Sequence, residues 1–147
     1  MSVTLGHNYE FDNSLGTPSS QKILRFLSVW NVLSFQTLRE LTSISESQLH
    51  NSLKSLLSLN VISRKSRGIY SFSDNEFAIK IKSAYYSLAI SLVNYKINEI
   101  ETFLDDGRIN QARDLFRKVD QEYSPLLSTH FDFVMDSLVH QFLDLNQ

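Results

Sequence analysis

The sequence predicts a mainly α-helical protein with one small β-hairpin. Apolar residues recur every three or four positions through most of the 147-residue chain, which is the spacing of one helix face. The chain has only 4 Gly and 2 Pro, too few for a many-stranded β architecture with frequent tight turns. One segment, residues 61–72, has β-prone ends around a glycine. The expected order is therefore three helices, the hairpin and a longer helical region.

Two helices are expected before residue 43. Pro18 suits a first helical position, and Thr17 precedes it as a candidate cap. Apolar residues then recur at helical spacing, which predicts a first helix over about residues 18–30. Ser34 can cap a second, short helix, whose apolar face consists of Phe35, Leu38 and Leu41.

The third helix and the hairpin follow directly. Ser45 begins the helix, and Gln48, three residues later, completes a capping-box pattern. The apolar face of this helix consists of Leu49, Leu53, Leu56 and Leu57. Asn60 is a suitable left-handed stop. In the hairpin over residues 61–72, Gly68 lies in a polar centre, and the tip is basic.

Three further helices are expected after the hairpin. The first, over roughly residues 74–105, carries a seam close to a heptad repeat, formed by Phe77, Ile81, Ala84, Leu88, Leu92 and Tyr95. The segment Asp105-Asp106-Gly107 should break it. A shorter helix begins near Ile109 and is expected to end before Tyr123, and the last covers about residues 126–145.

The formal net charge of −2 conceals an asymmetry between the two halves of the chain. Residues 17–73 contain seven basic and two acidic residues, whereas residues 74–147 contain seven basic and twelve acidic ones. A basic segment joined to an acidic one suggests that only the first meets a polyanion. The alternative is two solvated surfaces whose opposite signs carry no function.

Length and composition exclude several classes of protein. A chain of 147 residues fits one domain, or a small domain with an appendage, rather than a large enzyme. The absence of Cys excludes a disulfide framework, Cys-ligated zinc and a thiol nucleophile. No apolar run approaches the length of a membrane-spanning helix, and the first ten residues lack the pattern of a secretion signal. We expect a cytoplasmic protein with no membrane partner, in which residues 1–17 form a tail or an arm.

No catalytic or metal site is expected. The sequence has no Gly-rich phosphate loop, no metalloprotease motif and no Ser-His-Asp order. The last helix carries His130, Asp132, His140 and Asp144, but its two histidines are ten residues apart, about 80° away from a common face. We therefore expect no enzymatic activity, no cofactor and no metal, whereas the sequence leaves open whether a small-molecule effector binds.

Three helices followed by a basic hairpin is also the order of elements in a winged helix-turn-helix. Four segments resemble the MarR/ArsR-like group of winged-helix regulators of transcription. These are LSFQTLREL (33–41) for the second helix, ISESQLHNSLKSL (44–56) for the recognition helix, NVI (60–62) for the entry to the wing and RGIYSF (67–72) for its returning strand. The resemblance implies a DNA-binding domain over residues 18–73. It specifies a fold better than a function.

The outward side of the third helix carries residues suited to reading DNA. With the leucines inward, its polar side chains lie outward or near the helix start, where they can reach base edges in the major groove. Asparagine and glutamine amides offer the paired donor and acceptor that adenine needs. The predicted base-reading residues are Ser47, Gln48, His50 and Asn51. The predicted contacts to the DNA backbone, or through the wing to the minor groove, are Ser45, Lys54, Arg64, Lys65 and Arg67.

Two residues depart from a simple DNA-binding surface. Glu46 would face phosphate unfavourably, and Asn51 stands where the resembled family often has Arg. Winged helices also bind proteins. The alternative function is therefore a winged-helix scaffold that contacts protein partners within a larger assembly.

Residues 74–147 are expected to form a helical dimerisation region. In the resembled group, helices outside the winged domain commonly form the two-fold interface. The predicted interface residues are Phe77, Ile81, Leu88, Leu92, Phe131, Leu138 and Phe142. The alternative is that these apolar stripes are the ordinary core of one chain. A homodimer would place two recognition helices roughly 34 Å apart and predicts a palindromic site.

Overall fold

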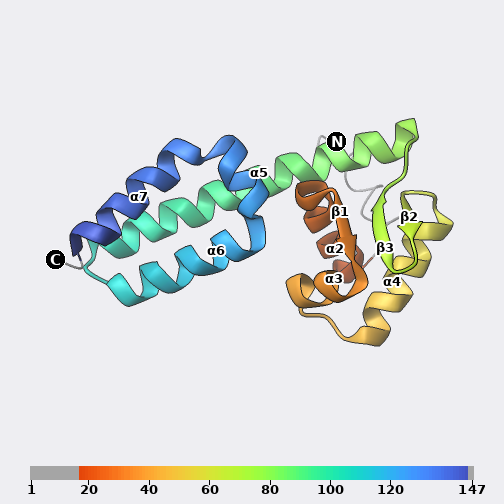
Figure 1. The fold of residues 1–147 in the computed structure, drawn as a ribbon, viewed down its shortest axis with the longest axis horizontal. Coiled ribbons are helices and arrows are strands. Elements are labelled where there is room, and N and C mark those ends of the chain that lie inside the picture. The colour runs from red at the N-terminus through yellow and green to blue at the C-terminus, as the bar shows by residue number, and fades with distance from the viewer. Residues whose placement is uncertain (1–16, 146–147) are drawn as a thin grey trace, which may run out of the picture. The chain divides into compact units, whose positions relative to one another are not determined.

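The computed structural model describes residues 17–145 and shows a mainly helical chain with a three-stranded antiparallel sheet (Figure 1). The predicted mainly α fold class is confirmed. The described chain divides into two compact units, residues 17–86 and 87–145. This division lies inside a long helix, whereas the sequence places the boundary after residue 73. The predicted arm over residues 1–17 lies outside the described residues, except for Thr17.

The three helices predicted for the first unit are confirmed. They are α2 (Pro18–Trp30), α3 (Phe35–Thr42) and α4 (Glu46–Ser58). Each helix begins after its predicted cap, because the hydroxyls of Thr17, Ser34 and Ser45 each accept a hydrogen bond from the backbone N–H three residues on. Such a cap satisfies one of the N–H groups that a helix start leaves without a partner. Asn60, just after α4, has the predicted left-handed conformation, with φ of 59°.

The predicted hairpin consists of β2 (Ile62–Ser66) and β3 (Ile69–Phe72). Gly68 lies in its tight turn with φ of 70°, a conformation in which glycine avoids the steric cost of a Cβ atom. The structure adds a strand that the sequence did not predict, β1 (Val32–Ser34). It pairs with β3, so the strand order is β1-β3-β2. The backbone N–H of Phe35 donates to the Gly68 carbonyl over 2.8 Å and joins the start of α3 to the hairpin turn.

The core of the first unit lies between its helices and its sheet. Helix α2 packs against α3, α4, β1 and β3, and α4 packs against β2. The buried side chains include Ile23, Leu24, Phe26, Leu27, Leu38, Leu49, Leu53, Leu56, Val61 and Ile62. Because α4 turns its leucines into this core, its opposite side lies at the surface.

Three helices follow the hairpin, with bounds that differ in part from the prediction. They are α5 (Glu76–Asp105), α6 (Ile109–His130) and α7 (Asp132–Leu145). The predicted break after α5 is confirmed, and Gly107 takes a φ of 76° there. The helix that begins at Ile109 was expected to end before Tyr123, and the backbone leaves helical geometry at that residue, where two helical segments of α6 meet at a kink. The last helix was expected to run unbroken over residues 126–145, and this prediction is wrong.

Backbone geometry explains the kink and the missed break. Tyr123 has non-helical backbone angles two residues before Pro125. Pro125 has no backbone N–H to donate, and its ring clashes with the preceding turn of the helix. The true break lies at Phe131, with φ of −126° and ψ of 17°. Asp132 then begins α7, where a carboxylate suits the positive end of the helix dipole. The apolar spacing continues through Phe131, so periodicity gives no sign of this break.

The second unit has its own apolar core. Its buried side chains include Ala89, Val93, Ile97 and Ile100 of α5, together with Val119, Leu138 and Phe142. Helices α6 and α7 pack against each other, and the rings of Phe116 and Phe142 meet edge to face with their centroids 5.2 Å apart. Among residues 17–145, no helix combines the length and apolar character needed to cross a membrane.

Candidate nucleic-acid interface

Helix α4 presents a polar ridge to solvent. Leu49, Ser52, Leu53 and Leu56 are buried on one side of the helix. At 100° per residue, Ser47, Asn51 and Lys54 fall together on the opposite side, and all three are exposed. We call these three residues the α4 ridge. All nine predicted DNA-contacting residues are exposed, so the first unit covers none of them.

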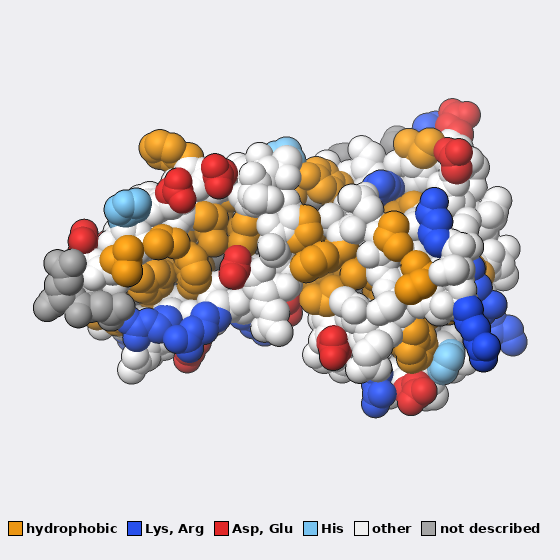
Figure 2. All heavy atoms as spheres, in the orientation of Figure 1, with side chains coloured by type: hydrophobic (Ala, Val, Ile, Leu, Met, Phe, Trp, Pro, Cys, Tyr) orange, Lys and Arg blue, Asp and Glu red, His pale blue; other side chains and the backbone are white. Residues whose placement is uncertain are grey.

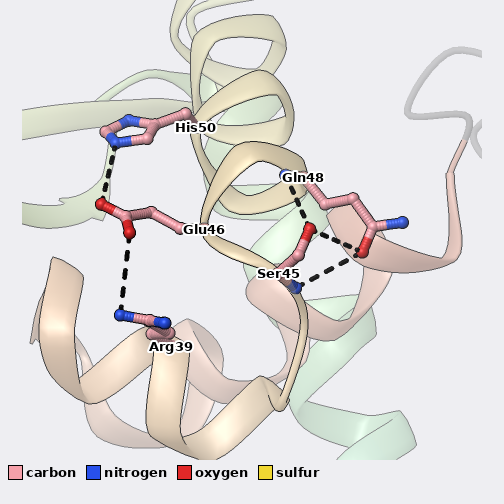
Figure 3. A network of polar contacts seen from close by, with 5 residues as sticks. All are labelled: Arg39, Ser45, Glu46, Gln48 and His50. Carbon is pink, nitrogen blue, oxygen red and sulfur yellow. Dashed lines mark hydrogen bonds and ion pairs between the residues drawn. The ribbon is translucent and has the colours of Figure 1, made fainter.

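Gln48 lies beside the ridge and takes part in the helix cap. Its Oε1 accepts from the Ser45 backbone N–H over 3.4 Å and from the Ser45 hydroxyl over 3.3 Å. In return, the Gln48 backbone N–H donates to the Ser45 hydroxyl over 3.2 Å. The capping box that the sequence predicted is therefore formed (Figure 3). Because the amide oxygen is already engaged, Gln48 can offer adenine the paired donor and acceptor only by leaving the cap.

A polar network occupies the other flank of α4. One Glu46 carboxylate oxygen lies 3.8 Å from Nη1 of Arg39 on α3, and the other lies 4.0 Å from Nε2 of His50 (Figure 3). The His50 ring stacks on Phe35, with centroids 4.5 Å apart and an interplanar angle of 29°. The network thus joins α3 and α4 at the surface. It also positions the predicted base reader His50 beside a carboxylate.

The hairpin carries the cations that the sequence assigned to the wing. Arg64, Lys65 and Arg67 are all exposed, and Figure 2 shows Lys and Arg side chains gathered at the end of this unit that carries α4, β2 and β3. The Arg64 guanidinium lies over the ring of its cross-strand partner Tyr70, 6.0 Å from the centroid. The β2–β3 register shifts between Arg64 and Ser66, which is a bulge next to the hairpin turn.

A hollow of about 330 Å³ lies between α4 and the hairpin. Four of the predicted DNA-contacting residues line this hollow, together with two leucines and a tyrosine. Its lining consists of His50, Asn51, Lys54, Arg64, Leu53, Leu57 and Tyr70. Lys54 and Arg64 thus belong to one concave, cationic surface. Ser45, Ser47, Gln48, Lys65 and Arg67 do not line the hollow.

Three residues at or beside the candidate site were not identified from the sequence as site residues: Phe35, which stacks on His50, Arg39, which approaches Glu46, and Tyr70, which lines the hollow. Arg39 comes from the helix before α4, and Tyr70 comes from the strand after the wing turn. These residues contact the site either from α3 across the turn to α4 or from β3 across the pairing with β2. Neither kind of contact has a sequence signature of its own. Within residues 17–145, no group of three or more His, Asp or Glu side chains could hold a metal ion.

The residues predicted for a dimer interface fall into two groups. Ile81, Phe131, Leu138 and Phe142 are buried by their own chain, so a second copy is not needed to cover them. Phe77 and Leu88 are 46% and 53% exposed, and Leu92 is half-buried. Other apolar residues of the second unit, outside the prediction, are also exposed, and they include Tyr95, Phe133 and Leu143.

Comparison of the chain with protein-family models, with curated proteins and with solved structures finds no match.

Proposed function

We propose that this chain is a winged-helix regulator of transcription that binds double-stranded DNA sequence-specifically as a homodimer. Helix α4 enters the major groove, where the first residues of a recognition helix reach base edges. The α2–β1–α3–α4–β2–β3 order supports this proposal, because it places a hairpin directly after a helix-turn-helix. The sequence resemblance over residues 20–73 agrees with this order.

One observation carries the proposal: the α4 ridge and the cationic hairpin are exposed together, with Lys54 and Arg64 lining the same hollow. Lys and Arg side chains on such a surface contact phosphates and fix the orientation of the protein on the duplex. The amide of Asn51, at the centre of the ridge, offers adenine an adjacent donor and acceptor. The exposed Ser47 can donate to or accept from several bases.

We expect binding to duplex DNA to weaken steeply with salt. Each phosphate contact releases counterions and contributes about −0.9 to the slope of log K against log salt. If Lys54, Arg64, Lys65 and Arg67 each contact one phosphate, this slope should be about −3.6 per subunit. Selection from random duplexes supplies the site, and fluorescence anisotropy from 50 to 300 mM salt gives the slope. Weak binding that does not change with salt would contradict the proposal and favour the protein-binding scaffold.

The homodimer forms in this proposal through the second unit. Leu88, Leu92 and Tyr95 follow i, i+4, i+7 spacing on α5, and Leu88 and Tyr95 are 53% and 67% exposed. Apolar stripes of this kind can pack against the same stripe of a second helix. A two-fold assembly matches two recognition helices to the two halves of a palindromic site.

Light scattering should give a mass of about 34 kDa at micromolar concentration, twice the 17.0 kDa of one chain. The double variant Leu88→Asp with Tyr95→Asp should have the mass of a monomer, because it places two charges in the apolar stripe. Asn94→Asp, an exposed position on the same helix, adds charge without removing apolar surface and should remain dimeric. A wild-type mass near 17 kDa would overturn the dimer.

A further inference from the structure

We infer that Glu46 selects a cytosine in the DNA site. Its carboxylate accepts a hydrogen bond from the N4 amino group of a cytosine in the major groove, so the site contains a G·C pair opposite the first turn of α4. This inference rests on the proposed DNA-binding function and adds one base to it. It also changes the role of Glu46, which the sequence alone presents as unfavourable to phosphate.

The position of Glu46 suits base contact. It is the first residue of α4, and its side chain is 58% exposed. Residues at the start of a recognition helix reach base edges, whereas phosphates lie farther out at the rims of the groove. An ionised carboxylate can only accept hydrogen bonds, and the amino group of cytosine is the donor that Glu and Asp recognise in the major groove.

The neighbours of Glu46 hold its carboxylate without using its acceptor capacity. Arg39 and His50 lie 3.8 and 4.0 Å from its two oxygens, which is beyond hydrogen-bond length. Both oxygens therefore keep lone pairs that an incoming amino group can occupy. Because the His50 ring also stacks on Phe35, this side of the network is fixed to α3.

Arg39 also reduces the electrostatic cost of bringing a carboxylate close to DNA. The Arg39 side chain is 48% exposed and its guanidinium lies beside the carboxylate, so its positive charge offsets the repulsion between Glu46 and the phosphates. Gln48, on the opposite flank, has its amide oxygen engaged in the helix cap. Unlike Gln48, Glu46 is thus a first-turn side chain whose acceptor atoms remain available to read a base.

The competing explanation is that Glu46 only fastens α3 to α4. Ion pairs between side chains this exposed contribute little to stability. A fastening role therefore predicts a small change in melting temperature when Glu46 is removed. It predicts no change in the preference for any base.

Selection from random duplexes by wild type and by Glu46→Ala distinguishes the two explanations. We expect the wild-type site to contain one cytosine whose replacement by each other base weakens binding about 5- to 150-fold, as measured by anisotropy at fixed salt. In Glu46→Ala the same replacements should change affinity by less than about threefold, while preferences at the other positions remain. Circular dichroism melting checks that the variant is folded.

Glu40→Ala is the matched control. Glu40 is exposed on α3, and its loss removes the same charge from the same helix-turn-helix. Any general gain in affinity from reduced repulsion should appear in both variants, whereas loss of the cytosine preference should appear in Glu46→Ala alone. If wild type selects a site and Glu46→Ala keeps its base preference at every position, the inference is wrong and the proposed function stands. If wild type binds no duplex, both are overturned.

Discussion

Replacing Arg64, Lys65 and Arg67 together by alanine should weaken binding to every duplex by a few hundredfold at 0.1 M salt. Each phosphate contact contributes about 0.9 to the salt slope, so three lost contacts should reduce its magnitude by about 2.7. The loss should be the same for the selected site and for unrelated DNA, because backbone contacts carry no base information. Anisotropy titrations of both duplexes across a salt series measure the two quantities.

The control for this variant removes the same charge elsewhere. Arg108, Arg117 and Lys118 are exposed on the second unit, and their replacement by alanine should leave the salt slope unchanged within error. If both triple variants lose affinity equally, net charge rather than the hairpin governs binding. That result would contradict the docking of the wing on DNA.

Leu49→Ala should lower the free energy of unfolding of the first unit by about 2–5 kcal/mol. Leu49 has no exposed surface and lies in the first half of α4, so its truncation leaves a cavity under the turn that carries Glu46 and His50. Affinity for the selected duplex should fall as well, because α4 loses the packing that fixes its direction. Urea denaturation followed by circular dichroism measures the stability change.

Ser55→Ala tests the specificity of that effect. Ser55 is exposed on the same helix, and alanine is a better helix former than serine. The free energy of unfolding of the Ser55→Ala variant should therefore differ from that of wild type by less than about 0.5 kcal/mol. A loss below about 1 kcal/mol for Leu49→Ala would show that α4 is not anchored by this side of the core.

Local chemistry explains why the first unit could be predicted so closely. Each cap is a contact between residues three apart, so Thr17, Ser34 and Ser45 reveal helix starts in the sequence itself. The left-handed Asn60 is local in the same way. Strand β1 is different, because its three residues become a strand only through pairing with β3, far along the chain.

The exposure of the candidate site residues could be predicted from the sequence, but the contacts among them could not. Residue type and helical period identified the exposed polar positions of α4 and the hairpin. They did not show that Gln48 is engaged in the cap or that Arg39 approaches Glu46, since both depend on side-chain rotamers and on the angle between helices. Along α5, the predicted seam mixes buried Ile81 with exposed Leu88, because an apolar residue gives no sign of which neighbour will cover it.

Because β1 pairs with β3, the exposed surface of α4 forms only when the whole first unit folds. Leu33 lies opposite Tyr70, so α3, α4 and β2 are enclosed in a loop of roughly 35 residues that this pairing closes. The entropy of closing that loop is offset only when the sheet and the core form together. A fragment limited to the two helices would lack this closure, and the surface proposed to face DNA is therefore a cooperative product of the whole first unit.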